Sequence, residues 1–334
     1  MNVFYGDSDS GENKKGLPLE EIRVDRDFTW GKRKGRIPSV FWGKEGIVLD
    51  LYFQIPPEEI RTFLDKWRDR KNFGDLSEEE TEQLEAESPF SSSFKAEAVV
   101  DGCGMRTENS SSFGWNPFDE EREAALAAGE KGDERQEILD YYGLDRKSGW
   151  DFTRIHFRWD TEHPADGEEL QLKLIGRKQP FTAAHFTTEV PCGPMELEVI
   201  HPLTGQAFCL KVHSCEPDRA DLKELAGRKR GVYEYPECYA ALTCSMTPSL
   251  SQKEFGIRDC VQSDAVRMKK GSGVLASSVF MVGGKKQEKE PEPTFLSSLH
   301  FEEVKKVEWR VVFYEKTQED LSLQIRLSGK EENV

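Results

Sequence analysis

The segment at 193–215 constrains the fold more than any other part of the chain, because apolar and polar residues alternate on both sides of a turn. Such period-two patterning is typical of β-strands that bury one face. The turn, His-Pro-Leu-Thr-Gly at 201–205, is rich in residues that favour chain reversal. With Leu203 and Thr204 as the loop, three apolar pairs face each other: Val199 with Phe208, Leu197 with Leu210, and Met195 with Val212. A slip of one residue would set glutamates against leucines, so the pattern predicts a hairpin in this register.

The same register gathers metal-capable side chains on the polar face of the hairpin. Cys192 is expected opposite Cys215, Cys209 opposite Glu198, and His213 two residues from Cys215. Thiolates and imidazoles are ligands that zinc prefers, so Cys192, Cys209, His213 and Cys215 are candidate zinc ligands. A cross-strand disulfide and a purely structural role for these cysteines stay open, because the close cysteine pairs typical of structural zinc sites are missing.

Other alternating stretches predict a mainly β fold of the α+β class, either an antiparallel β-sandwich or two packed sheets, with a helical insertion. The clearest single strand covers 46–55, and a short strand at 40–42 is expected to pair with it. Two prolines at 56–57 then open an amphipathic helix that reaches Trp67. An acidic helix follows, for which Ser77 and Glu80 form a predicted capping box.

Five segments are expected along the chain. They are a flexible lead-in at 1–36, a strand hairpin with the helical insertion at 37–148, a β-rich core at 149–264, a flexible Gly/Ser-rich and charged linker at 265–296, and a C-terminal hairpin at 297–334 that completes the core. The lead-in and the linker are assigned from their polar, charged and glycine-containing composition. The C-terminal hairpin is assigned from two alternating runs on either side of 316–320.

The charge balance limits the expected partners. With 62 acidic and 46 basic residues among 334, the net charge of −16 repels phosphate backbones and anionic lipid surfaces, so neither nucleic acid nor a membrane is an expected partner. The first residues lack the pattern of a secretory signal, although a chain trimmed of its leader would look the same. Seven cysteines without framework spacing favour free thiols. We therefore expect a cytoplasmic protein.

Two further groups of residues are candidate sites. Cys103 lies between two glycines, where a thiol is open to substrate, and with a histidine from elsewhere it would suit a hydrolase or transferase. A structural turn at 101–104 is the alternative. Arg154, His156 and Arg158 share one face of a predicted strand, where they could bind an anion or pair with acidic residues of a neighbouring strand.

Several short motifs occur together over most of the chain. They are Ile-Pro-Pro-Glu-Glu-Ile-Arg at 55–61 with Phe-Leu-Asp-Lys-Trp at 63–67, Gly-Cys-Gly at 102–104, Trp-Asn-Pro at 115–117, the turn at 201–205, Leu-His-Phe-Glu at 299–302 and Val-Glu-Trp-Arg at 307–310. In these motifs the chain resembles an uncharacterised family of bacterial proteins of about this length. The resemblance implies no activity, because none is established for that family.

The sequence contains no phosphate-binding loop, dinucleotide fingerprint, zinc-protease motif or nucleophile elbow. Since active sites are also assembled from distant residues, this does not exclude an enzyme. Together with the β patterning it favours a non-enzymatic soluble protein that binds a protein partner or a small ligand. The alternatives are a cysteine-dependent hydrolase or transferase built on Cys103 and a zinc-stabilised structural module built on the central hairpin.

Overall fold

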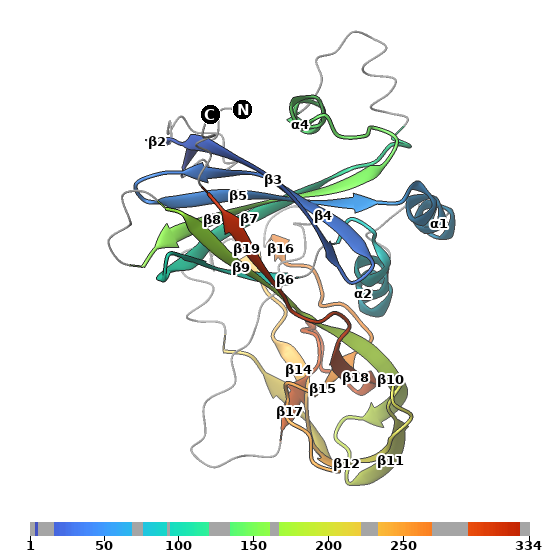
Figure 1. Cartoon of the computed structure of the whole chain (residues 1–334). Helices are drawn as coiled ribbons and strands as arrows, with labels where there is room; N and C mark the ends of the chain where they lie inside the picture. Colours follow the sequence, from blue (N-terminus) through green and yellow to red (C-terminus); the bar gives the residue numbers. More distant parts are fainter. Residues whose placement is uncertain are drawn as a thin grey trace, which may run out of the picture. The chain divides into compact units, whose positions relative to one another are not determined.

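Two units, each assembled from separate parts of the chain, make up the computed structural model (Figure 1). Unit 1 comprises Met1–Lys71, Leu84–Arg177 and Lys316–Val334, and unit 2 comprises Asn72–Gln83 and Lys178–Glu315. The structure describes residues 4–5, 17–68, 76–91, 94–119, 134–160, 167–221, 233–268 and 293–327. The paired strands with assigned registers are antiparallel and helices are few, which confirms the mainly β, α+β fold class.

Unit 1 is built on one antiparallel sheet of eight strands. In sheet order they are β19 (Leu321–Arg326), β9 (Glu169–Gly176), β6 (Phe94–Val100), β7 (Cys103–Trp115), β8 (Gly149–Trp159), β5 (Gly46–Ile55), β4 (Arg33–Trp42) and β3 (Glu20–Trp30). The sheet is nearly closed, because the indole Nε1 of Trp30 on one edge strand donates a 2.7 Å hydrogen bond to the carbonyl oxygen of Glu319, just before the other edge strand. Figure 1 shows the red β19 beside the green β9.

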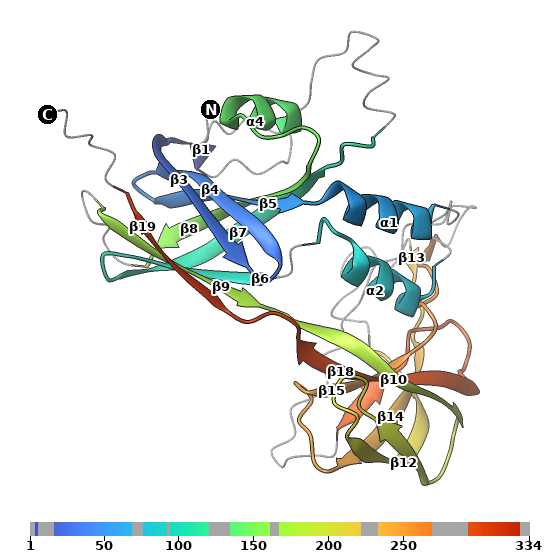
Figure 2. The same ribbon diagram turned by 45° about the vertical axis from the view of Figure 1, so that its right-hand side comes forward.

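Apolar side chains from all eight strands fill the interior of this sheet. Along β5, Ile47, Leu49, Leu51 and Phe53 belong to the interior cluster, as the alternating pattern predicts. The outer face carries a second apolar cluster under helix α4 (Glu134–Tyr142), which lies against the sheet in Figure 2. Both faces of β5 are therefore buried, and each fully buried large apolar side chain contributes roughly 1.5–3 kcal/mol.

The predicted helices form where the sequence signals place them. Helix α1 (Pro57–Trp67) begins with proline and two acidic residues and buries Ile60 and Trp67. Helix α2 (Glu78–Glu87) begins in unit 2 and ends in unit 1. Its capping box is formed as predicted: the Ser77 hydroxyl accepts a 3.1 Å hydrogen bond from the Glu80 amide, and the Glu80 carboxylate accepts one of 3.0 Å from the Ser77 amide. In addition, β1 (Phe4–Tyr5) pairs with β2 (Leu17–Pro18).

Unit 2 contains two sheets that share one apolar core, which is the sandwich arrangement. The first sheet has the order β10 (Lys178–Glu189), β18 (Lys306–Lys316), β15 (Phe255–Asp259). The second has the order β11 (Met195–Ile200), β12 (Ala207–Arg219), β14 (Cys238–Thr247), β17 (Thr294–Leu296). A separate pair joins β13 (Tyr233–Glu234) to β16 (Arg267–Met268). The core takes side chains from both large sheets, including Phe208, Leu242, Phe255 and Trp309.

The register predicted for the central hairpin is confirmed. Strands β11 and β12 pair Met195 with Val212, Leu197 with Leu210 and Val199 with Phe208. Cys192 also lies opposite Cys215, in an isolated bridge three residues before the start of β11. Apolar alternation on both sides of the turn was therefore sufficient to fix the pairing.

The expected segment boundaries are wrong at the N-terminal and central parts. The lead-in at 1–36 contains β3 and the start of β4, because Ile22, Val24, Phe28 and Trp30 alternate toward the interior of unit 1. The charged residues between them hid this pattern. Strands β8 and β9, expected in the central core, pair in the sheet of unit 1, so the unit boundary falls after Arg177 and not after residue 148.

The C-terminal part also differs from the expectation. The predicted hairpin of 297–334 does not form: β18 pairs with β15 in unit 2, whereas β19 pairs with β9 in unit 1. Alternation identifies both strands but does not identify their partners. The ends of the predicted linker at 265–296 carry β16 and β17, and its residues 269–292 lie outside the described part of the chain.

Replacing Gly46 by alanine tests the close approach of β5 and β8. A Cβ at this position would fall on the backbone carbonyl of Phe157, which cannot move without separating the two strands. We expect Gly46→Ala to lower the unfolding free energy by about 2 kcal/mol or more in urea denaturation. Gly104→Ala, whose Cβ would make only an ordinary 3.6 Å contact with Asp160, is the control and should change it by less than about 0.5 kcal/mol. Equal effects of the two substitutions would contradict this packing.

Candidate functional site

An open cleft of about 400 Å³ in unit 2 is bounded by two segments that lie far apart in the sequence. One wall is formed by residues of 261–267, which follow β15, and the other by 300–306, which lead into β18. We call it the unit 2 cleft. Its volume is in the range of small-ligand sites.

The Asp264 carboxylate joins the two walls. Its Oδ2 accepts a 2.9 Å hydrogen bond from the Phe301 amide, and its Oδ1 lies 3.5 Å from Nδ1 of His300. The Asp264 amide donates to the Leu299 carbonyl at 2.9 Å, and the Ser263 hydroxyl accepts from the Leu299 amide at 3.0 Å. These contacts fix the cleft walls and orient the His300 ring before any ligand is bound.

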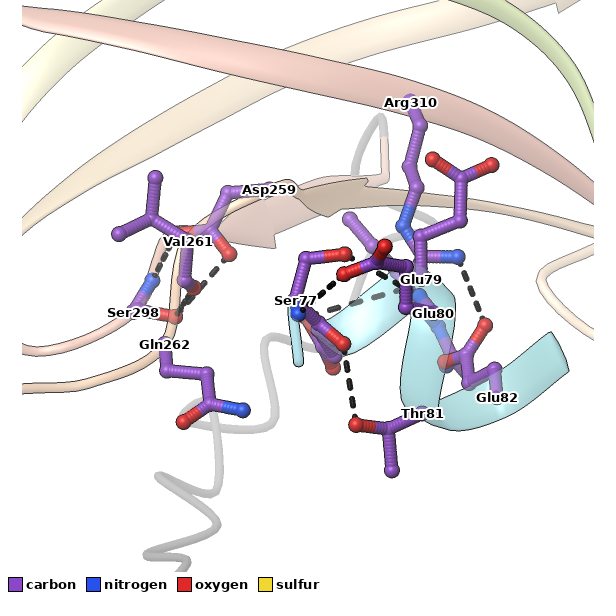
Figure 3. A network of polar contacts seen from close by, with 12 residues as sticks. Ser77, Glu79, Glu80, Thr81, Glu82, Asp259, Val261, Gln262, Ser298 and Arg310 are labelled. Atoms are coloured by element: carbon purple, nitrogen blue, oxygen red, sulfur yellow. Dashed lines mark hydrogen bonds and ion pairs between the residues drawn. The ribbon is translucent and has the colours of Figure 1, made fainter. Parts of the chain in front are cut away.

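Asp259 anchors the base of the same wall (Figure 3). This carboxylate is 4% exposed and accepts hydrogen bonds from the Ser298 amide at 2.6 Å and the Ser298 hydroxyl at 3.0 Å. Burial raises the pKa of Asp259, and the Ser298 hydrogen bonds offset only part of that effect. Asp259 therefore holds two chain segments together and does not reach the cleft lining.

Three cations line the cleft: Arg267, Lys305 and Lys306. The Arg267 guanidinium carbon lies 4.2 Å from the centre of the Phe301 ring, a cation–π contact. Within the residues that the structure describes, none of the three forms an ion pair with a carboxylate. By contrast, Glu303 on the same rim is paired with Arg219 at 3.0 Å. The cleft is therefore lined by three cations without ion-pair partners in the described part of the chain, beside the carboxylates of Asp264, Glu302 and Glu303.

A buried arginine, Arg310, holds the first turns of α2 on the three-stranded sheet of unit 2 (Figure 3). Its side chain is 1% exposed, and its Nη1 donates a 2.7 Å hydrogen bond to Glu82. Nη2 lies 3.8 Å from Glu78, and Arg258 also pairs with Glu82. Burial raises the pKa of Glu78, and Arg310 offsets part of the effect. We call these residues the α2 clamp.

Two more contacts secure the same segment. Gln262 donates a 3.0 Å hydrogen bond to the Leu76 carbonyl, and Glu79 pairs with His185 at 2.9 Å. The acidic helix predicted from the sequence thus uses three of its carboxylates to bind basic residues of unit 2. The charged groups of the α2 clamp pair with one another. The clamp therefore holds the start of α2 on the sheet of unit 2 and is not a ligand site.

The four expected zinc ligands do not converge. Pairing of β12 with β14 shifts between Val212 and Ser214, so a bulge at His213 reverses the alternation beyond it. Cys215 consequently joins the apolar core beside Cys192, whereas Cys209 stays on the opposite face and His213 contacts the Ser245 hydroxyl at 2.9 Å. No group of three or more His, Cys, Asp or Glu suited to a metal ion occurs in the described residues.

The sequence left two interpretations of the basic face on β8: a site for an anion, or pairing with acidic residues. The structure shows that its two arginines pair with acidic residues. Arg154 makes two hydrogen bonds to Asp50, from Nε at 2.7 Å and from Nη2 at 3.0 Å. Tyr52 donates to the same carboxylate at 2.9 Å. Arg158 pairs with Glu108 at 3.2 Å in an exposed position. His156, also on β8, is buried at 5% exposure, so these residues do not form an open anion site.

Cys103 is the first residue of β7 and lies opposite Val100, next to the turn at 101–102. His156, on the neighbouring strand β8, lies opposite Asn109, six positions further along β7. At about 3.3 Å per residue this separation is roughly 20 Å, which is too long for a thiol–imidazole pair. His163 lies outside the described residues.

Sequence reasoning missed the unit 2 cleft. Arg267 falls in the expected linker, and His300 falls in the expected C-terminal hairpin. The two walls are joined mainly by polar side chains of 259–264 that bind the backbone of 298–301. Such side-chain-to-backbone contacts leave no periodic signal in a sequence.

No family model, curated protein or solved structure matches the chain. The resemblance to a bacterial family therefore stays a prediction. None of the helices in the described residues combines the length and apolar character that crossing a membrane requires.

The two arginine pairs on β8 provide a matched test. Asp50→Ala would leave the mostly buried Arg154 with only its 3.6 Å pair to Glu134 and the Tyr52 hydroxyl without its acceptor, and we expect a loss of about 3 kcal/mol of unfolding free energy. Glu108→Ala removes the partner of a half-exposed arginine and should cost at most about 1 kcal/mol. Urea denaturation measures both. A similar cost for the two variants would mean that the Asp50 cluster is not buried as described.

The α2 clamp is tested by Glu82→Ala, which removes the carboxylate shared by Arg310 and Arg258. We expect about 3 kcal/mol less protection of the β15 and β18 amides in hydrogen exchange, because a buried arginine loses its partner. Glu85→Ala on the exposed part of the same helix is the control and should leave protection within about 0.5 kcal/mol. Unchanged protection in Glu82→Ala would contradict the docking role.

Proposed function

We propose that the protein is a non-enzymatic binding protein and that its unit 2 cleft holds a small anionic ligand with carboxylate or phosphate groups. The observation that carries this proposal is the set of three cations without carboxylate partners, Arg267, Lys305 and Lys306, in a chain of net charge −16. An anion from solution would supply the partners that these three cations do not find in the described part of the fold, although three carboxylates line the same cleft.

The other lining groups narrow the ligand's chemistry. Stacking of Arg267 on Phe301 leaves guanidinium N–H groups for bidentate contact with an anion. Nδ1 of His300 lies 3.5 Å from Asp264, so its other ring nitrogen, Nε2, is the one left to hydrogen-bond a ligand hydroxyl. Val261, whose side chain is 52% exposed, provides an apolar contact. A hydroxyl-bearing polycarboxylate has all of these features.

The alternative function, a cysteine-dependent hydrolase or transferase, has weaker support than ligand binding. Burial raises the pKa of Cys192 and of Cys215, and it raises that of Cys260 to about 11, so these thiols stay protonated at neutral pH. A catalytic cysteine that reacts rapidly at neutral pH needs the opposite shift, so these three thiols do not suit the active site of a cysteine-dependent enzyme. The separation of Cys103 from His156 also favours the binding role over a cysteine-dependent hydrolase or transferase.

We further infer a cytoplasmic setting. All seven cysteines are free, which fits a reducing compartment. Membership in the bacterial family suggested by the sequence motifs belongs to the same proposal. It would place the protein in a bacterial cell.

Calorimetric titration with citrate, which combines carboxylates and a hydroxyl, tests the proposed site. The variant Arg267→Gln/Lys305→Gln/Lys306→Gln should bind citrate at least about tenfold more weakly, since a hydrogen bond to a charged group contributes roughly 1.5–3 kcal/mol. Lys253→Gln, an exposed cation elsewhere in unit 2, is the control and should bind like the unchanged protein. Added salt should weaken binding.

Pyrophosphate serves as a second anionic probe. If neither citrate nor pyrophosphate binds the unchanged protein, or if the triple variant binds as well as the control, the cleft is not an anion site. Chemical conversion of a bound ligand, detected by mass spectrometry, would contradict the non-enzymatic part of the proposal.

A further inference from the structure

Cys192 and Cys215 lie directly opposite each other in an antiparallel bridge. Each backbone amide donates to the other carbonyl, at 3.0 Å from Cys192 and 3.3 Å from Cys215. In such a hydrogen-bonded pair the Cα atoms are about 5.5 Å apart, within the range that a disulfide spans. The Cα separation of the pair is therefore compatible with a bond between these two sulfurs.

The bulge at His213 determines which face of the sheet this cysteine pair occupies. By bringing Cys215 to the core face, it places both side chains in one environment, where the two thiols interact with each other. The Thr188 hydroxyl contacts Cys215 Sγ at 3.5 Å. Cys209 remains on the opposite face of β12, so it does not compete for either sulfur.

The two thiols differ in access to solvent. Cys192 is half-buried, whereas Cys215 is fully buried with 0% exposure. An oxidant arriving from solution therefore reaches Cys192 first, and Cys215 is placed to react only with its neighbour. This is the division between an attacking and a resolving cysteine.

We propose that Cys192 and Cys215 form a reversible cross-strand disulfide, with glutathione disulfide as the oxidant. The Cys192 thiolate attacks one sulfur of glutathione disulfide, forms a mixed disulfide and releases one glutathione. The Cys215 thiolate then attacks Cys192 Sγ, forms the protein disulfide and releases the second glutathione. Two protein thiols thus lose two protons and two electrons, and one glutathione disulfide is reduced to two glutathione molecules. This inference is independent of the ligand proposed for the unit 2 cleft.

Two physical features make the bond reversible and slow to form. Side chains of a hydrogen-bonded pair lie further apart than those of a non-hydrogen-bonded pair, so the crosslink is strained and readily reduced. Burial raises the pKa of both thiols, so little thiolate is present at neutral pH. Below the pKa the thiolate fraction, and with it the rate, should rise about tenfold per pH unit.

Peptide mapping of the full chain after incubation with glutathione disulfide and alkylation of the remaining thiols tests the proposal. The unchanged protein should yield a linked peptide pair containing Cys192 and Cys215, which added reduced glutathione reverses. Cys215→Ser should accumulate a glutathione mixed disulfide at Cys192, because the resolving thiol is gone. Cys192→Ser should leave Cys215 unmodified. Cys209→Ser is the control and should crosslink like the unchanged protein.

The unchanged protein decides the question even where a variant fails to fold. If Cys192 and Cys215 are recovered only as separately alkylated or separately glutathionylated residues at excess glutathione disulfide, the proposal is wrong. Loss of the crosslink in a folded Cys209→Ser variant, or a linked peptide joining any other two cysteines in place of this pair, would also overturn it.

Discussion

Strand β19 pairs with β9 through Leu321, Leu323 and Ile325, which lie opposite Leu174, Leu172 and Leu170. This apolar pairing supplies the last strand of the eight-stranded sheet and brings its edge to Trp30. The chain between the two strands, Lys178–Glu315, forms most of unit 2. Unit 2 is thus inserted at the point where a short hairpin turn would otherwise connect β9 to β19, and the closure of unit 1 depends on a contact between residues on either side of that insertion.

Arginine has two different uses in this acidic chain. Arg310 is buried and Arg154 is mostly buried. They are hydrogen-bonded to Glu82 and Asp50, so their charges are neutralised within the fold. Burial of ion pairs costs desolvation energy, and their value lies in specifying which segments dock together. Arg267 makes no such pair within the described residues. The distinction between the two kinds of arginine separates the structural polar clusters from the cleft proposed to bind a ligand.

Local alternation made part of this structure predictable. It identified β5, β11 and β12, and it fixed the register of the central hairpin, because a single shift there would bury glutamates. It did not identify long-range partners: β18 and β19 read as a hairpin, yet they belong to different sheets. It also failed at His213, where one extra residue reverses the faces and separates Cys209 from Cys215. The cleft was beyond sequence reasoning, since Asp264 and His300 meet through polar contacts that have no period.

The position of β19 has a consequence for how the chain is made. On a ribosome, β9 emerges long before β19, so one edge of the apolar sheet of unit 1 stays open while unit 2 is synthesised. Within unit 2, β10 and β18 are neighbours, and the Val190 amide at the end of β10 donates to the Lys305 carbonyl at the start of β18. The antiparallel arrangement brings Lys178 near Glu315 once unit 2 has folded. Folding of unit 2 therefore shortens the effective loop between β9 and β19 and lowers the entropic cost of closing it. Folding of unit 2 thus favours the pairing of β9 with β19 that completes the sheet of unit 1.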